Sequence, residues 1–293
     1  MEILVDNKGL DLTNLSNVLI ESNNNSITFM PKQVVKDPIK LLFKENLKSP
    51  FSINVGDLTE LNLILEYELN NDAEIKEEIN LTIGKQANVK YLFVSENAKG
   101  KINIVKNISI GRDSNLLQIG TFNNKDINSD WYVGLDGIGA KINVQNLLIS
   151  SDSDSQIISY HLTHNAKQTD ADLNLIGAAT EQGFVQLNGI AKIENGMNKS
   201  NAFQTLKGII LNEDARIDVN PILIIDEYDI KAGHAATVGK IEEEQLYYLM
   251  SRGLNKVAAT KLIVKGFLTP VIDLINDEDI KNHLLEIVEE KLW

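Results

Sequence analysis

A short unit that recurs along the middle of the chain constrains its fold more than any other feature. Each copy has a polar turn, a small residue, one variable residue and an aliphatic residue. The small residues are Ala87, Ser114, Ala140, Ala171 and Ala215. They follow one another after 27, 26, 31 and 44 positions, the last of these being close to two shorter steps. Irregular steps of this size are typical of a β-solenoid, with the small residue at a tight corner and the aliphatic residue inside the coil.

The segments between these turns have the alternating pattern of β-strands. Leu61, Leu63 and Leu65 recur at every second position, and residues 79–83 repeat the alternation. Every second side chain of a strand lies on the same face, so the pattern predicts strands with a buried face. The pattern alone fits two architectures: a β-solenoid, or a β-sandwich whose turns recur by coincidence.

The chain divides into three regions. Residues 1–50 form a short N-terminal segment, in which residues 39–43 predict a short apolar helix. Residues 51–239 form the strand-rich core. Residues 240–293 change to the helical period and predict a C-terminal α-helical domain.

Capping residues divide this last region into separate helices. Asn255 and Asp277 stand where N-caps of helices are expected, and Gly253 fits a C-cap. The pair Thr269-Pro270 indicates that one helix stops there and another starts.

Composition and charge exclude several classes of function. The 293 residues carry a net charge of −13, which repels nucleic-acid phosphates and anionic membranes. There is no cysteine, so the chain supplies neither a disulfide nor a thiolate ligand. The residues after Met1 lack the pattern of a signal peptide, so we expect none, and no run of 18 apolar residues occurs. We therefore expect a cytoplasmic protein.

Two histidines and a pair of glycines are motifs that do not indicate a site. His161 and His164 are three positions apart on an expected strand, so their side chains point to opposite faces and do not meet at a metal. Gly137-Ile138-Gly139 fits a turn, and the chain has no phosphate-binding G-x-x-x-x-G-K motif.

Four aspartates are candidates for a calcium site. The residues are Asp152, Asp154, Asp170 and Asp172. Carboxylates of this kind collect calcium in β-helical polysaccharide lyases, although Ser- and Asp-rich stretches are also typical of solvated turns. A β-solenoid carbohydrate-active enzyme is therefore a remote alternative.

Two features near the boundary between strands and helices are candidates for function. Arg252, Lys256, Lys261 and Lys265 form a positive run in an acidic chain, which fits either a solvated helix face or a docking site for an acidic partner. His234 lies among small residues, where a partner or ligand can approach, and imidazole is a good ligand for iron. A structural role for this histidine is the other interpretation.

At this boundary the sequence resembles the SufB/SufD family of iron–sulfur cluster assembly proteins. Three motifs carry the resemblance in order: P-x-L-x-I at residues 221–225, K-x-x-H-x-A-T-x-G at 231–239, and E-Q-L-x-Y-L-x-S-R-G at 244–253. Residues 157–275 match well, and the first 150 residues match only in style. The pair Val238-Gly239 favours the SufD branch.

The resemblance implies a mainly β fold, a right-handed parallel β-helix with a C-terminal helical domain. It implies a scaffold without enzymatic activity, which pairs with a SufB-like subunit and binds the SufC ATPase. In the family the ATPase docks on the C-terminal helices, so Tyr247 and Tyr248 join the positive run as docking candidates. A cluster would form transiently at the SufB–SufD interface, with His234 contributing, and no cofactor is expected on this chain alone.

The sequence also departs from the family. Many members have cysteine where this chain has Ala232, so a thiolate ligand must come from a partner. We also expect no developed N-terminal helical domain. A SufB-like homodimeric scaffold is the near alternative, and the absence of cysteine argues against it.

Overall fold

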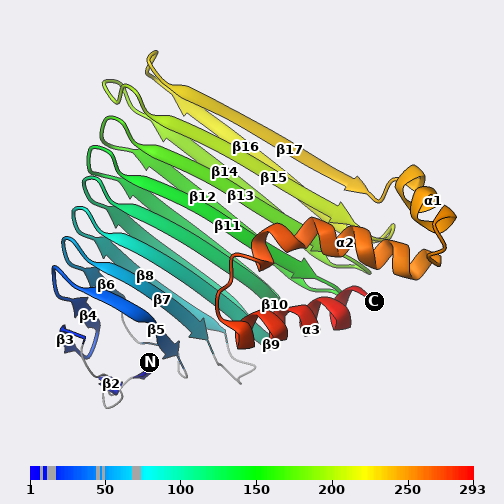
Figure 1. The fold of residues 1–293 in the computed structure, drawn as a ribbon, viewed down its shortest axis with the longest axis horizontal. Helices are drawn as coiled ribbons and strands as arrows, with labels where there is room; N and C mark the ends of the chain where they lie inside the picture. The colour runs from blue at the N-terminus through cyan, green and yellow to red at the C-terminus, as the bar shows by residue number, and fades with distance from the viewer. Residues whose placement is uncertain (7–8, 12–17, 44–46, 48–49, 68–73) are drawn as a thin grey trace.

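The computed structural model describes residues 1–6, 9–11, 18–43, 47, 50–67 and 74–293. In this part of the chain, stacked parallel strands are followed by three helices (Figure 1). None of the helices in the described ranges is long and apolar enough to cross a membrane.

Each coil contributes strand segments to two parallel sheets, which we call the covered sheet and the bare sheet. The covered sheet contains β1 (Glu2–Asp6), β5 (Val34–Phe43), β7 (Glu60–Tyr67), the first parts of β9 (Asn88–Ile110) and β10 (Asn115–Leu135), β11 (Lys141–Ser150), β13 (Asp170–Ala179), β15 (Asn201–Ile210) and β17 (Lys231–Lys240). The bare sheet contains β4 (Ser26–Phe29), β6 (Phe51–Val55), β8 (Ile75–Ile83), the second parts of β9 and β10, β12 (Ser155–His164), β14 (Phe184–Ile193) and β16 (Arg216–Ile225). At the first coils, β2 (Gly9–Asp11) and β3 (Ile20–Asn23) pair antiparallel with β1 and β4.

The register between strands confirms a solenoid and excludes the sandwich. Asn115 pairs in parallel with Lys141, 26 positions later, and Asp170 with Asn201, 31 positions later. Such in-register parallel pairing of successive coils does not occur in an antiparallel sandwich.

A left-handed residue marks the corner before each strand of the covered sheet from β5 to β15. These residues are Lys32, Leu58, Gln86, Asp113, Gly139, Gln168 and Lys199. Each donates its backbone N–H to a carbonyl of the next coil, as Gln86 does to Arg112 at 2.8 Å. From Leu58 on, a small buried residue follows each of them, and these are Thr59, Ala87, Ser114, Ala140, Thr169 and Ser200. The repeating unit is therefore an inter-coil hydrogen bond followed by a small side chain.

The predicted corner positions are confirmed for Ala87, Ser114 and Ala140 and are wrong for Ala171 and Ala215. Ala171 lies within β13 opposite Ile142, and Ala215 precedes β16 at the opposite corner. The hydroxyls of Thr169 and Ser200 fill the corner instead and lie 2.9 Å apart. The small residues Ala171 and Ala215 lie near these turns in sequence but not at this corner of the coil. The turn at residues 137–139 is confirmed, with a positive φ of 74° at Gly139.

The short helix predicted at residues 39–43 is wrong, because this segment belongs to β5. Ile39, Leu41 and Phe43 point into the solenoid and are fully buried, and β5 pairs with β7. Leu42 is also buried on the other side of the strand. A strand with both faces covered lacks alternation, so its short apolar run resembles one turn of a helix.

The three helices are α1 (Glu243–Ser251), α2 (Lys256–Ile272) and α3 (Glu278–Leu292). Both predicted N-caps are confirmed, since Asn255 accepts from the backbone N–H of Ala258 and Asp277 from that of Ile280. Gly253 has φ 98° and donates to the carbonyl of Met250, as a C-cap does.

Pro270 does not end α2, contrary to the prediction from the pair Thr269-Pro270. The helix continues to Ile272. Val271 and Ile272 are buried against the sheet, and this packing outweighs the missing hydrogen bond of the proline nitrogen.

Helices α2 and α3 lie across the outer face of the covered sheet (Figure 1). Val264, Leu268 and Ile287 belong to one buried cluster with outward side chains of the sheet, such as Ile119 and Leu147. A further tie joins Lys291 of α3 to Asp154 at the corner before β12. Helices α2 and α3 are therefore packed on the solenoid.

The interior of the solenoid is aromatic in its first coils. Trp131 is fully buried and stacks with Tyr160 at 5.2 Å between ring centroids. Lys106 lies among these rings, with its Nζ 3.8 Å from the Phe93 centroid and 2.6 Å from the Tyr91 hydroxyl. Burial lowers the pKa of Lys106 well below its usual value, and the carboxylate of Glu77 opposes this shift.

Candidate functional site

The last coil of the solenoid is formed by β16 and β17, and none of the described residues forms a further coil on it. Its inward side chains are therefore reached by solvent: Ile225 and Val238 are each 37% exposed. In the coil below, Ile225 pairs with Ile193 and Val238 pairs with Gly208, and both of these partners are buried. This open end combines apolar side chains with unpaired strand edges.

His234 lies on the inward side of this open end. It pairs in register with Gln204 of β15, which is 2% exposed, and in-register side chains of parallel strands lie on the same face. Gln204 reaches across the coil and donates through Nε2 to the carbonyl of Ile222 at 3.1 Å. The imidazole of His234 is exposed, because no strand in the described part of the chain is stacked above it. The sequence did not predict this pairing, although 30 positions between the two residues is one coil length.

The docking candidates lie on α1 and α2. Tyr247 and Tyr248 are 75% and 56% exposed, and the guanidinium of Arg252 lies 5.3 Å from the centroid of the Tyr248 ring. All residues of α1 are at least partly exposed. This helix therefore presents two aromatic rings and a cation to solvent.

The lysines of the positive run line two different hollows. Lys261 pairs with Glu289 of α3 at 2.5 Å, and with Lys265 it lines a groove between α2 and α3. Lys256 stands at the first turn of α2 and lines a separate hollow beside the covered sheet. The sequence run therefore does not form one continuous patch.

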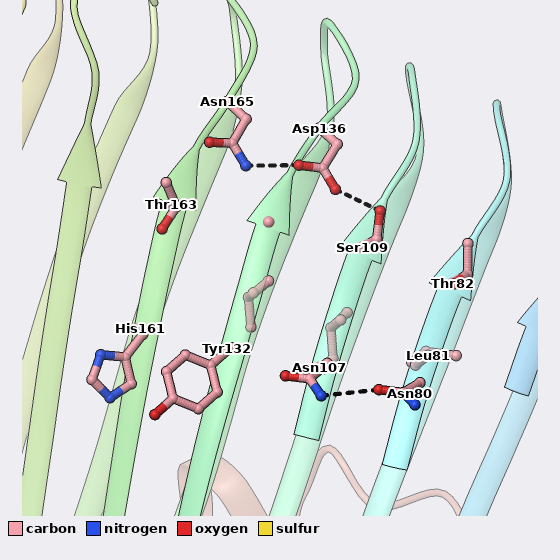
Figure 2. Close-up of a pocket in the computed structure, with 13 residues that line it drawn as sticks. Asn80, Leu81, Thr82, Asn107, Ser109, Tyr132, Asp136, His161, Thr163 and Asn165 are labelled. Atoms are coloured by element: carbon pink, nitrogen blue, oxygen red, sulfur yellow. Dashed lines mark hydrogen bonds between the residues drawn. The ribbon is translucent and has the colours of Figure 1, made fainter. Parts of the chain in front are cut away.

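A shallow hollow of about 440 Å³ lies on the outer face of the bare sheet (Figure 2). The rings of Tyr132 and His161 stack there at 4.6 Å with 14° between their planes. Asp136 accepts from Asn165 at 2.7 Å and from the Ser109 hydroxyl. This group could not be predicted from the sequence, because its members come from four coils.

His161 and His164 lie on opposite faces of β12, as predicted. His161 faces the hollow, whereas His164 is fully buried with Nδ1 2.7 Å from the Thr169 hydroxyl. Burial lowers the pKa of His164 to about 4, so its imidazole is neutral near pH 7.

The four aspartates do not come together. Asp152 and Asp154 lie at the corner before β12, whereas Asp170 and Asp172 begin β13 at the opposite corner. Within the described ranges, no three His, Cys, Asp or Glu side chains are grouped to hold a metal ion.

Comparisons with known proteins identify the family. Residues 45–267 match the model of the SUF system FeS cluster assembly SufBD core domain. The chain is 35% identical over 212 residues to the iron–sulfur cluster assembly protein SufD of Bacillus subtilis, covering 71% of this chain and 48% of that protein. It is 30% identical over 113 residues to SufD of Escherichia coli, covering 39% of this chain and 27% of that protein. A SufBD family protein of Pyrococcus horikoshii is 26% identical over 284 residues, covering 87% of this chain and 62% of that protein.

The chain spans about half the length of the Bacillus subtilis relative. The residues that match the family model include the solenoid strands from β6 on, the boundary motifs, the open end with His234 and most of α2. The chain belongs to the SufB/SufD family of the SUF iron–sulfur cluster assembly system and is most like SufD.

Proposed function

We propose that this chain is a SufD-like scaffold subunit without enzymatic activity of its own. It pairs through its open end with a SufB-like subunit, and its C-terminal helices receive a SufC-like ATPase. The right-handed sense of the coil and a cytoplasmic location are part of this proposal. An iron–sulfur cluster is the cargo, held transiently at the interface between subunits.

The observation that carries the proposal is the open last coil with His234 on its inward side. Solenoids need a cap or a partner over a terminal coil, because its apolar interior is otherwise in water. A partner coil placed there would cover Ile225 and Val238 and would bring its own side chains to His234. Since this chain has no cysteine, the partner would supply thiolate ligands and His234 an imidazole.

The packing of the helices supports a route for ATP-driven motion. Tyr247, Tyr248 and Arg252 present an exposed surface on α1, which the chain connects directly to β17. Lys256, Lys261 and Lys265 add positive charge on α2. A movement of these helices by the ATPase would act on the covered sheet below α2 and on β17, and would open the interface around His234.

His234→Ala tests the role of the histidine. We expect the complex with the SufB-like and SufC-like partners to keep its mass, because the side chain is exposed, while iron and acid-labile sulfide in the purified complex fall severalfold. His283→Ala is the matched control, since it removes an exposed imidazole from α3. Equal cluster content in the His234 variant and the control would contradict the role.

Two alternatives have different expected outcomes. A SufB-like homodimeric scaffold would place a second copy on the open end and would assemble clusters without a SufB-like partner. The family match favours a role in cluster assembly over a carbohydrate-active enzyme, and the separated aspartates do not provide a calcium site.

A further inference from the structure

The hollow on the bare sheet arises where one row of side chains changes size. In register from coil to coil, this row runs through Asn80, Asn107, Tyr132 and His161. Two short amides are followed by two stacked rings, so a step forms beside the Tyr132 ring. Tyr132 is 46% exposed, and Figure 2 shows both rings beside each other with the amides on the neighbouring strands.

The polar groups around this step are held in place by one another. Asn107 donates through Nδ2 to Asn80 at 2.9 Å and to Glu78 at 3.1 Å. Asp136 is held between Asn165 and Ser109. Fixed amides and carboxylates of this kind lose little conformational entropy when a ligand binds.

Several donors and acceptors remain for a ligand. Within the described residues, no hydrogen bond involves the Tyr132 hydroxyl, the ring nitrogens of His161 or the amide nitrogen of Asn80. Thr82 and Thr163 add hydroxyls at the border of the hollow. The hollow therefore offers an aromatic platform surrounded by neutral groups that both donate and accept.

The charge of the hollow limits the class of ligand. Lysine and arginine are absent from the described residues that line it, and Asp136 is the one carboxylate among them. In a chain of net charge −13, phosphates and other anions are repelled. A neutral ligand with an apolar face and many hydroxyls matches both the ring platform and the amides.

We propose that this hollow binds a neutral sugar of one or two rings. The C–H face of one sugar ring stacks on the face of Tyr132 that is turned away from His161, at the step, and its hydroxyls bond to Asn80, Asn107 and the threonines. This site is separate from the open end and from the helices, so it does not depend on the role of His234.

Saturation-transfer NMR with the full chain tests the proposal. The probes are maltose, cellobiose and chitobiose, with adenosine and glucose 6-phosphate as comparison ligands. We expect transfer to at least one disaccharide, and weaker or no transfer to the phosphorylated sugar. Transfer to none of the disaccharides, or a stronger signal from adenosine, would overturn the sugar assignment.

Variants connect any binding to the hollow. Tyr132→Ala and Asn107→Ala are each expected to weaken binding at least about fivefold, because each removes one contact to the ligand. Phe203→Ala is the matched control, since this ring is 44% exposed on β15, away from the hollow. Circular dichroism checks the fold of each variant. Binding unchanged by both hollow variants, or lost equally in the control, would contradict the site.

Discussion

The first and last coils of the solenoid are filled by different side chains. In the first coils, aromatic rings contact one another from Phe43 to Tyr160, through Tyr67, Phe93 and Trp131. In the last coils the register replaces large side chains by small ones: Gly189 follows Tyr160, and Gly177 and Gly208 follow Leu148. The first coils also carry the antiparallel strands β2 and β3, whereas the last coil is open.

This difference indicates that the aromatic coils stabilise the fold, whereas the last coils leave a surface that fits the proposed assembly. Buried rings remove a large apolar area from water, so the aromatic coils supply much of the stability of the fold. The small-residue coils bury less, and their end presents exposed apolar side chains and a histidine. In the proposed assembly, a partner would complete the last coil, which would then need no large side chains of its own to fill it.

The largest expected effect is a loss of stability in the aromatic coils. Trp131→Ala should lower the free energy of unfolding by about 3–5 kcal/mol, because the cavity cannot close among fixed coils. Ile225→Ala, on the inward side of the last coil, should cost under about 1 kcal/mol, since Ile225 is 37% exposed. Urea unfolding of both variants measures the contrast. Similar losses at the two positions would remove the distinction between the two halves.

The next effect is a pH dependence from His164. Its pKa is about 4 in the folded chain and about 6.5 when unfolded, so the unfolded chain binds more protons between these values. The free energy of unfolding should therefore fall as the pH drops from about 6.5 to about 4, by at most about 3 kcal/mol. Urea unfolding at pH 7, 6 and 5 should show a flatter dependence for His164→Gln. The same slope in both proteins would contradict a buried neutral imidazole.

Much of the fold could be predicted from the sequence, because its strongest patterns are local. Alternation at Leu61, Leu63 and Leu65 indicated strands, and Asn255 and Asp277 indicated helix starts. The errors arose where tertiary packing overrides local pattern. Residues 39–43 are covered on both faces, and Pro270 is held in α2 by the burial of its neighbours.

The candidate sites were less accessible to prediction, because they form between coils. His234 was chosen from its surroundings and from family resemblance, but its position over Gln204 follows from the register. The stack of Tyr132 on His161 joins residues 29 positions apart. Residues one coil apart can be paired from the sequence only when the corner residue of each coil is known. The corner predicted at Ala171 was wrong, so the pairing in this part of the chain could not be predicted.

A substitution at the open end should have the smallest effect on stability and the largest effect on assembly. Val238→Asp should change the free energy of unfolding by under about 1 kcal/mol, because the side chain is partly in water. It should nevertheless prevent pairing, because a partner would bury the new carboxylate. Ile138→Asp, at an exposed turn, is the matched control and should pair normally.

Co-expression with a SufB-like and a SufC-like subunit, followed by light scattering of the purified material, tests the central claim most directly. The account predicts one stable complex that contains all three chains, retained with Ile138→Asp and lost with Val238→Asp. A chain that stays alone or binds only itself, or a complex that tolerates Val238→Asp, would contradict assembly through the open end.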